Sequence, residues 1–505
     1  MAAPAANRAL ITASLLMATL MNSLDMTIAN VALPHIQGSV SASQEQIAWV
    51  LTSYIIASAI MTPMASWLAG RFGRKNLLLV SIAGFTVASM LCGISNSVPE
   101  IVGFRLLQGV FGASLIPLSQ SILLDINPPE RHGQAMALWG AGTLLGPVMG
   151  PVLGGWLTDQ FSWRWVFFIN LPIGALALLG VWLFMTNAVI DIRKRFDFLG
   201  FAALIGFIGA LQLMLDRGPS LDWFSATEIR VYLIVAAICL WVFVIHTLTV
   251  ENPFFDRRLA KDSNFVAATF FAMATALLMF SSIALLPSMM QGILNYPVLT
   301  SGFLTMPRGI GSLIAMLVIG QLVGRADTRI ILGVGMSLTA LAFWQMIHFD
   351  LSMNEWPMVV SSFIQGFGIG LTFVPLTTLA FSTLPAELRP EASTVYTLVR
   401  NIGASVGISI MQALLVNSTQ SAHAGLAARI NPADPVVRAD MPAMFDPGAV
   451  PGLLALNSEI TRQATMIAYL NDFRLMLVVT IITVPLVFLL RPAKAPPKDL
   501  HVAAD

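Results

Sequence analysis

Runs of about twenty apolar residues recur along almost the whole chain, and they restrict its fold more than any other feature. Of the 505 residues, 56% are hydrophobic and 10% are charged, whereas soluble globular chains carry about 25% charged residues. A surface so poor in charge cannot face water, and an apolar run of about 20 residues can cross a lipid bilayer as a helix. The sequence therefore predicts an all-α polytopic membrane protein.

Reading the apolar runs between polar breaks predicts fourteen membrane-spanning helices. Their expected ranges are 10–33, 46–69, 76–95, 99–124, 133–157, 164–186, 197–215, 229–250, 264–287, 299–323, 329–348, 356–381, 392–416 and 472–490. The first run is too long for a signal peptide and lacks a clear small-residue cleavage site, so we interpret it as a span. Because the number of spans is even, both termini are expected on one side.

Lysine and arginine are distributed unequally between the two sets of loops. Seventeen of the 27 basic residues fall in one set of alternate segments and seven fall in the opposite set. The richer set holds Arg8, Arg71, Arg74, Lys75, Arg131, Arg193, Lys194, Arg195, Arg257, Arg258, Lys261, Arg325, Arg329, Arg389, Arg491, Lys494 and Lys498. Because loops rich in Lys and Arg remain in the cytoplasm, both termini are predicted to be cytoplasmic.

One predicted outer segment, the periplasmic loop 417–471, is much longer than the other outer loops. It contains the stretch NPADPVVRADMPAMFDPGAVPG, which is rich in Pro and Asp. Two interpretations are open, a polar connector and a docking element for a partner outside the membrane.

A weak internal repeat relates the two halves of the chain. The segment WLAGRFGRKNLLLV after the second span matches QLVGRADTRIILGV after the tenth, and a Gln-Gly pair precedes a proline in both the fourth and the twelfth spans. We therefore expect a six-helix bundle over 1–190, two inserted helices over 191–255 and a second six-helix bundle over 256–505. Two repeated bundles around a midplane site are a common plan of secondary transporters.

Asp25 is the one carboxylate that the sequence places well inside a predicted span, in NSLDMTIANVALP. A charge there costs at least about 2.5–3.5 kcal/mol on insertion scales, so an intramembrane Asp is a functional candidate. Burial disfavours the charged form and would let Asp25 bind a proton. Asn22 lies one turn earlier on the same helical face. Two roles are open for Asp25, proton or substrate coupling and a structural hydrogen bond between packed helices.

Arg105 lies in the apolar run RLLQGVFGASLIPLSQSILLD, and a guanidinium stays charged in any realistic protein site. It could set the proton affinity of Asp25, contact anionic cargo or act as a structural clamp. Arg308 and Arg400 raise the same question. If these arginines approach one cavity, its positive potential favours neutral or weakly acidic cargo over dications. The residues expected to line the substrate cavity are Asn22, Asn30, Gln108, Gln365, Tyr396 and Arg400.

In the fifth predicted span, LWGAGTLLGPVMGPVLGGWLTD, a glycine recurs every fourth residue. This spacing makes a flat face that another helix can approach closely, and prolines permit bending. The motif could serve static packing or a moving contact. Its residues are Gly142, Gly146, Pro147, Gly150, Pro151, Gly154 and Gly155.

The loop AGRFGRKN between the second and third spans is basic. Arg71, Arg74 and Lys75, around Gly73, are placed to meet carboxylates or helix C-termini that approach in only one conformation. They also carry charge that sets the topology.

Together these segments resemble the signature motifs of the major facilitator superfamily: LDMTIANVALP, GRFGRK, RLLQGVFGASLIPLSQS and GPVMGPVLGG. The first and last are typical of its fourteen-span drug:proton antiporters. The segments FFINLPIG, LMLDRGPSLDWFS, ENPFFD and VPLTTLAFSTLP resemble the EmrB branch of Gram-negative bacteria. The resemblance covers essentially the whole chain. The family's loop motif usually has Gly where Ser66 stands and Asp where Gly70 stands, which calls the charge latch built on that Asp into question.

The resemblance implies alternating access across the bacterial inner membrane, with export of drugs or lipophilic acids against proton entry and with Asp25 and Arg105 as coupling residues. It also implies a tripartite pump with a periplasmic EmrA-type adaptor and a TolC-type outer-membrane channel. No GxxxxGK[ST] motif and no metal-ligand cluster occurs in the sequence, so we expect neither an enzyme nor a cofactor. Export of an endogenous metabolite or fatty acid is one alternative, and a non-transporting receptor or scaffold is another.

Overall fold

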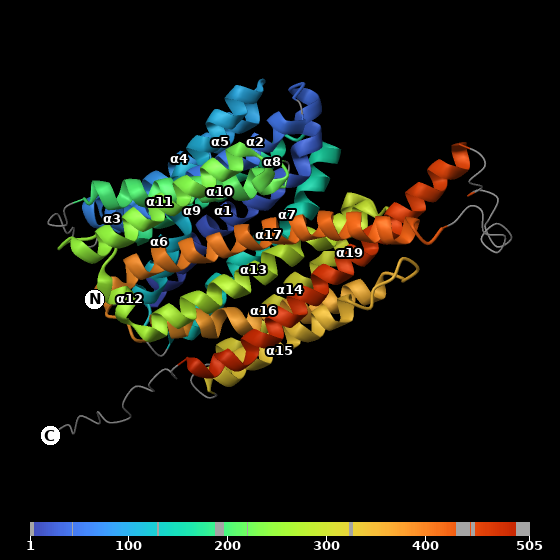
Figure 1. Ribbon diagram of the computed structural model, residues 1–505. Helices are drawn as coiled ribbons and strands as arrows, with labels where there is room; N and C mark the ends of the chain where they lie inside the picture. The colour runs from blue at the N-terminus through green and yellow to red at the C-terminus, as the bar shows by residue number, and fades with distance from the viewer. Residues whose placement is uncertain are drawn as a thin grey trace, which may run out of the picture.

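The computed structural model describes residues 5–42, 44–128, 131–186, 196–219, 221–322, 327–430, 445 and 450–490. These residues are helical, with turns and short connections between the helices (Figure 1). Thirteen helices in the described ranges are long and apolar enough to cross a membrane, and one bent pair brings the number to fourteen when it is counted as a single span. The predicted all-α membrane fold is confirmed.

Six spans form the first group of packed helices. They are α1 (Ala5–Ser39), α2 (Gln44–Met61) with α3 (Met64–Phe72), α4 (Arg74–Ile94), α5 (Val98–Gly112) with α6 (Leu115–Ile126), α7 (His132–Gln160), and α8 (Trp165–Phe168) with α9 (Asn170–Phe184). α1 packs against α7 and α9, while α5 packs against α2 and α4. We refer to these six spans as the first bundle.

The remaining spans form a helix pair and a second group. The pair is α10 (Phe198–Arg217) and α11 (Thr227–Thr249), and the second group is α13 (Ser263–Gly292), α14 (Val298–Leu322), α15 (Thr328–Met346), α16 (Trp356–Ser382), α17 (Arg389–Ala427) and α19 (Val450–Leu486), preceded by the short α12 (Arg257–Lys261). In the second group, which we call the second bundle, α16 packs against α14 and α15, and α17 packs against α13 and α19. α10 and α11 pack mainly against each other, and α10 also contacts α2 and α17.

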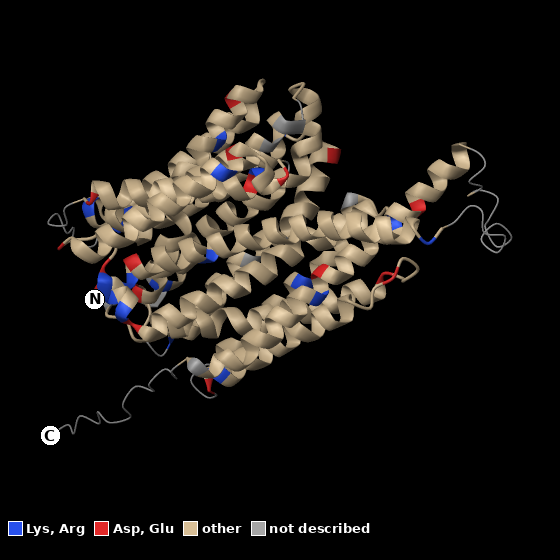
Figure 2. Cartoon of the chain, in the orientation of Figure 1, with Lys and Arg blue, Asp and Glu red and all other residues tan. Residues whose placement is uncertain are grey.

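The two bundles meet where α7 packs against α14 and α16 and where α6 packs against α17. α1 begins and α19 ends at the same end of the molecule (Figure 1). We call this the basic end because it holds Arg74, Lys75 and Arg389. Charged residues lie mainly toward the two ends of the helices, so the middle of the molecule is largely uncharged (Figure 2). A charge-poor middle band is the surface that a lipid bilayer requires.

The second predicted span, 46–69, is not one straight helix. α2 and α3 meet at an angle of 58°, and Pro63 stands at the start of α3. Proline has no backbone N–H and clashes with the preceding turn, so the helix breaks there. After α3 the chain reverses at Gly73, whose φ of 82° lies in the left-handed region that glycine adopts readily.

The segment predicted as the outer loop 417–471 is helical over much of its length, which corrects that prediction. α17 continues to Ala427 and α19 begins at Val450. The Nε2 atom of His423 on α17 and the Oδ1 atom of Asn457 on α19 are 3.1 Å apart. Hydropathy falls in these stretches, but Ala, Leu and Gln keep their high helix propensity, so the helices run on. Most of the Pro-rich stretch lies outside the described residues.

The glycine motif of α7 forms the contact between α7 and α1. A Cβ atom placed at Gly146 would meet Ser23 and lie 2.6 Å from the backbone nitrogen of Leu24, and one at Gly150 would meet Thr27. The Oγ atom of Ser23 donates a hydrogen bond to the carbonyl of Thr143 over 2.6 Å. The small residues therefore let the two helix backbones approach closely, as predicted from their spacing.

The other glycines of the motif in α7 differ in how closely they approach their neighbours. A Cβ atom at Gly142 would lie 3.0 Å from the flexible end of Leu16, and one at Gly154 would lie 3.1 Å from the carbonyl oxygen of Ile28. A Cβ atom at Gly155 would meet no heavy atom within 4 Å. Pro151 and its neighbour Val152 face α14, where Gly302 lies against them. α7 thus touches α1 with one face and the second bundle with another.

We predict that Gly146→Ala lowers transport and reduces the free energy of unfolding, because overpacking of this kind costs about 1–3 kcal/mol. The matched control is Gly155→Ala, whose new methyl group enters open space. Transport in proteoliposomes and the melting temperature in detergent measure both effects. Equal behaviour of the two variants would show that close approach at Gly146 is not needed.

Candidate functional site

A buried ion pair joins α1 to α5. The Nη1 atom of Arg105 lies 2.6 Å from the Oδ2 atom of Asp25, and both side chains are almost completely buried. Each is the charged member of an otherwise apolar stretch of helix. Because either charge alone would be strongly disfavoured inside the bundle, the pairing stabilises both. The structure thus places the two predicted coupling residues in direct contact.

The second oxygen of Asp25 is also bound by side chains. Its Oδ1 atom accepts hydrogen bonds from the Nε2 atom of Gln108 at 2.8 Å and the Nδ2 atom of Asn170 at 3.0 Å. Asn170 also donates to the Oγ atom of Ser89 at 2.9 Å. The carboxylate of α1 therefore connects α5 and α9, and Asn170 extends the network to α4. All of these donors are buried.

Arg105 makes further contacts that hold its guanidinium in place. Its Nε atom donates to the carbonyl of Val50 at 3.0 Å, and its Nη1 atom donates to the Oε1 atom of Gln108 at 2.8 Å. The guanidinium carbon lies 4.4 Å from the centre of the Tyr54 ring, a cation–π distance. Tyr54 in turn donates a hydrogen bond to the Oδ1 atom of Asn22. Arg105 therefore links α5 to α2.

Sequence reasoning missed Tyr54, Ser89 and Asn170 as members of this network. Asn170 begins α9 in the segment FFINLPIG, where an Asn is easily interpreted as an ordinary helix start. Its position in an apolar run was a usable signal. Tyr54 and Ser89 are common in apolar helices, and nothing in their spacing relates them to Asp25.

The six residues predicted to line one substrate cavity lie in several different environments. Asn22 and Gln108 belong to the Asp25 network inside the first bundle. Gln365 lies inside the second bundle, where its Nε2 atom is 2.9 Å from the Oγ atom of Ser282. Asn30 is exposed, and its Nδ2 atom bonds only weakly to the carbonyl of Met26 on its own helix, at 3.5 Å.

Arg400 and Tyr396 lie on the side of α17 that faces α16. The guanidinium carbon of Arg400 is 5.9 Å from the centre of the Phe373 ring, and Phe373 stacks on Trp139 of α7 at 5.8 Å. Tyr396 is buried, with its ring 5.8 Å from Phe381. The Nε atom of Arg400 has no hydrogen-bond partner in the described part of the chain. Arg400 thus stands beside aromatic rings where the two bundles meet.

The expectation that three arginines make one cavity positive does not fit this arrangement. The charge of Arg105 is balanced by Asp25. Arg308 lies inside the second bundle, with its Nη2 atom 3.2 Å from the Oγ atom of Ser282. Of the three, Arg400 alone lies at the meeting of the bundles. The physical reason is that helix rotation, which sequence does not reveal, sets the face from which each arginine points.

The basic loop makes both kinds of contact that its charge pattern suggested. Arg74 forms an ion pair with Asp125 at the end of α6, and the Nζ atom of Lys75 donates to the carbonyl of Trp182 near the end of α9 at 2.8 Å. Arg71 is exposed at the end of α3. Gly70, which stands where the family usually has Asp, meets no heavy atom within 4 Å of an added Cβ atom.

Asp125 also reaches across to the second bundle. The Nη1 atom of Arg389, at the start of α17, lies 3.4 Å from its Oδ1 atom. Nearby, the Oγ atom of Ser393 donates to the Oε1 atom of Gln120 at 2.8 Å. These bonds join α6 to α17 at the basic end. A carboxylate of α6 therefore contacts both Arg74 and Arg389, although the family Asp is missing from the loop.

Comparisons with known proteins agree with this architecture. Residues 15–408 match the Major Facilitator Superfamily. The chain is 38% identical to the multidrug export protein EmrB of Escherichia coli over 432 residues, which cover 85% of this chain and 84% of that protein. It is 33% identical to the fatty acid resistance protein FarB of Neisseria gonorrhoeae over 485 residues, covering 95% and 96%.

A solved structure has the same fold at low sequence identity. The human organic anion transporter MFSD10 (TETRAN) matches with a TM-score of 0.61 and 14% identity, over 94% of this chain and 100% of that one. Such a likeness concerns the fold alone.

We predict that Asp125→Asn makes the basic end open more often. A partly exposed ion pair contributes about 0.2–1 kcal/mol, so the population of the open conformation should rise up to about fivefold. Labelling of Ser121→Cys by a membrane-impermeant maleimide, with the two native cysteines replaced, reports this opening, because Ser121 is buried one turn after Pro117, which contacts α17, and its own hydroxyl bonds within α6. In the control Arg71→Gln the rate should stay unchanged. A rate in Asp125→Asn equal to that of the parent would contradict the role of this contact.

Proposed function

The chain belongs to the major facilitator superfamily, and from this premise we propose that it exports lipophilic small molecules in exchange for protons, as a multidrug efflux transporter. It is a transporter and not an enzyme. Its relatives in Haemophilus influenzae and Escherichia coli, at 37% and 38% identity, are named multidrug export proteins. The observation that carries the proposal is a buried carboxylate, Asp25, bound by one cation and two amides inside a helical bundle.

Protonation of Asp25 would act directly on α5 and α9. The neutral acid attracts Arg105 less strongly and no longer accepts two amide hydrogen bonds equally well, so Gln108 and Asn170 lose a fixed partner. Arg105 is then held mainly by its remaining acceptors, among them the carbonyl of Val50, to which its Nε atom donates. Proton binding therefore changes the relative stability of two packings of α1 against α5.

The packing of α1 against α7 supplies a route from this site to the other bundle. Ser23 and Thr27, two residues before and after Asp25, touch α7 at Gly146 and Gly150. The Oγ1 atom of Thr27 donates to the carbonyl of Gly146 at 3.1 Å. Since α7 also packs against α14, a shift of α1 moves a helix that contacts both bundles. A rigid contact of this kind is suited to rocking of one bundle against the other.

We place the basic end in the cytoplasm, because cytoplasmic loops carry the excess of Lys and Arg. The contacts of Asp125 with Arg389 and of Gln120 with Ser393 then close the cytoplasmic side. In this conformation the transporter has delivered cargo outward and can receive a proton from outside. In a bacterium with two membranes, the membrane crossed is the inner one.

For the cargo we propose neutral or weakly acidic lipophilic molecules. Trp139 and Phe373 offer aromatic surface where the bundles meet, and Arg400 offers a cation beside them. A fatty acid combines an apolar chain with a carboxylate, and the relative FarB is named a fatty acid resistance protein. Export of an endogenous fatty acid is therefore the second candidate, and it would use the same residues.

We also propose that the chain is the inner-membrane part of a tripartite pump and that its outer helical extensions bind a periplasmic EmrA-type adaptor, which joins a TolC-type channel. The first turns of α19 extend beyond the bundle (Figure 1) and present apolar side chains to the outside. Val450 is 71% exposed and Leu454 is 66% exposed. Apolar side chains outside the lipid band are typical of a protein contact.

We predict that Asp25→Asn abolishes pH-driven export. In proteoliposomes with an imposed pH gradient, the wild type should transport the neutral probe N-phenyl-1-naphthylamine. Oleate should inhibit this transport if the fatty acid binds at the same residues. The variant should not respond to the gradient, because Asn cannot bind a proton. Asp25→Glu, which keeps a carboxylate, should restore part of the response. Gradient-dependent export by Asp25→Asn at the wild-type rate would refute the assignment.

The same substitution leaves Arg105 buried without its counter-charge, which costs about 3–5 kcal/mol when one partner of a buried pair is removed. Its melting temperature in detergent must therefore be measured beside transport. Loss of transport counts as loss of coupling where probe binding by the folded variant is retained.

We predict that the triple change Val450→Ser, Leu453→Ser and Leu454→Ser reduces co-purification with the adaptor and leaves transport by the isolated protein unchanged. The reason is loss of exposed apolar area on α19. Ile330→Ser, at an apolar position of the basic end that is 60% exposed, serves as the control. Undiminished adaptor binding by the triple variant would eliminate this docking site.

A further inference from the structure

A second carboxylate is buried in the membrane-spanning part of the molecule. Because α19 begins at Val450 and not near residue 472, Asp472 lies in the middle of this helix and not at the edge of a span. Its side chain is 2% exposed. The prediction that Asp25 is the one carboxylate well inside a span is therefore wrong, because α19 is much longer than its hydropathy suggested.

The surroundings of Asp472 are almost entirely apolar. On α19 itself, Tyr469, Phe473 and Met476 belong to one buried cluster, to which α13 contributes Leu286 and Met289, α15 contributes Phe343 and Met346, and α17 contributes Met411. The Oδ2 atom of Asp472 has no hydrogen-bond partner in the part of the chain that the structure describes. This differs from Asp25, which binds a cation and two amides.

Charged groups on the helices packed against α19 do not neutralise Asp472. α13 contains no titratable side chain, and the one such residue of α15 is Arg329, at the basic end. On α19, Tyr469 lies close to Asp472, whereas Arg474 is exposed.

The titratable residues of α17 also face other partners. Arg389 and Glu391 lie at the basic end, Tyr396 and Arg400 lie on the α16 side, and His423 contacts Asn457 near the opposite end. An ionised carboxylate without a counter-charge is strongly disfavoured in such a place, so a proton must neutralise it.

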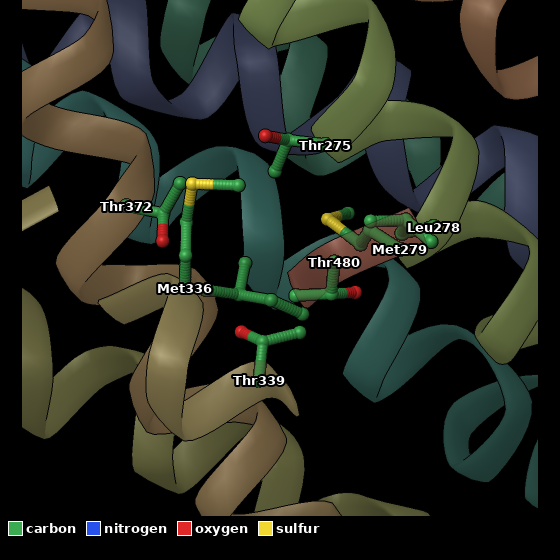
Figure 3. Close-up of a pocket in the computed structure, with 8 residues that line it drawn as sticks. Thr275, Leu278, Met279, Met336, Thr339, Thr372 and Thr480 are labelled. Carbon is green, nitrogen blue, oxygen red and sulfur yellow. The ribbon is translucent and has the colours of Figure 1, made fainter. Parts of the chain in front are cut away.

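Asp472 shares a helical face with Thr480, which lines a small and mainly apolar cavity. Met476, Thr480 and Thr483 follow it at intervals of three or four residues, and all are buried. Thr480 lines a cavity together with Thr275, Thr339 and Thr372 from three other helices of the second bundle (Figure 3). Thr480 is about 12 Å from Asp472 along the helix axis, at 1.5 Å per residue.

The cavity has a volume of about 10 Å³, which is room for about one water molecule. The Oγ1 atom of Thr275, one of the lining residues, has no hydrogen-bond partner among the described residues. The lining of this cavity is mainly apolar, and the hydroxyl groups of Thr339, Thr372 and Thr480 donate to carbonyls of their own helices, so the cavity offers a water molecule few partners.

We propose that Asp472 is a second proton-binding site, which holds a proton in this conformation and exchanges it during the transport cycle. The inference rests on proton-coupled transport and adds that the second bundle has a carboxylate of its own. α19 packs against α17, which carries Arg389 and Ser393 of the contacts that close the basic end. When the contacts at the basic end break, α17 is released from α6, and a shift of α17 against α19 within the second bundle would allow water to reach Asp472.

Infrared difference spectroscopy of the purified full-length protein tests this proposal. Spectra at acid and alkaline pH, with and without N-phenyl-1-naphthylamine, report the C=O band of a protonated carboxyl group. We expect a band that changes with pH and probe, that is lost in Asp472→Asn and that remains in Asp25→Asn. Asp472→Glu should shift the band and keep it. Arg474→Gln, at an exposed position of the same helix, should leave it unchanged.

Proton release on probe binding in weakly buffered solution gives an independent measure. Asp472→Asn should release roughly half as many protons as the wild type, because one of two exchanging carboxyl groups is gone, and the double variant with Asp25→Asn should release none. Two results would contradict the proposal: a band of Asp472 that never changes, or proton release by Asp472→Asn equal to that of the wild type. Either would show that Asp472 is a permanently neutral structural acid. If neither the wild type nor any variant releases protons, proton-coupled transport itself fails.

Discussion

The ion pair between Asp25 and Arg105 is the interaction on which the rest of the account depends. Two charges are held 2.6 Å apart inside a bundle that excludes water, and neither can remain there without the other. Gln108, Asn170 and Tyr54 complete the site, so that a single carboxylate fixes the relative positions of α1, α2, α5 and α9. Any event that changes the charge of Asp25 therefore acts on four helices at once.

The remaining features determine what such an event can move. The glycines of α7 bring its backbone against α1 on either side of Asp25, and the opposite face of α7 meets α14. At the basic end, Asp125 holds Arg74 of its own bundle and Arg389 of the other. The exposed ion pair is individually weak, which suits a contact that must break in every cycle. Changing the charge of the buried pair alters the free energy more than breaking the partly exposed pair does. A change at Asp25 can therefore determine whether the contact between Asp125 and Arg389 stays formed.

Much of the fold and part of the site could be predicted from sequence, and the physical reason differs from residue to residue. Asp25 and Arg105 stand out because each is a charge in an apolar run, where only a specific partner can retain it. The spacing of the glycines in α7 predicts a close helix contact from the sequence alone. Asn170 carries a weaker signal, a polar amide in an apolar run, which is easily interpreted as an ordinary helix start. Asp125 becomes informative only when α17 is brought beside α6.

The main errors came from hydropathy. It falls where α17 and α19 leave the apolar band, although the backbone remains helical, and this hid both the outer extensions and the central position of Asp472. The direction in which an arginine points is likewise fixed by helix rotation. The sequence alone therefore could not show whether Arg105, Arg308 and Arg400 face a common cavity.

The most direct test of the account is the distance between the bundles at the basic end as a function of the charge on Asp25. Spin labels at Phe72→Cys and Ile330→Cys, both exposed at that end, would be placed in a background without the two native cysteines and measured by double electron–electron resonance. Acidification should lengthen this distance in the parent protein, because a protonated Asp25 releases Arg105 and lets the contacts of Asp125 break. With Asp25→Asn most of this pH dependence should be lost, and any remainder should be no larger than the share that Asp472 contributes. A pH-dependent change of the same size in that variant would show that the conformation is controlled by another group and would contradict the account.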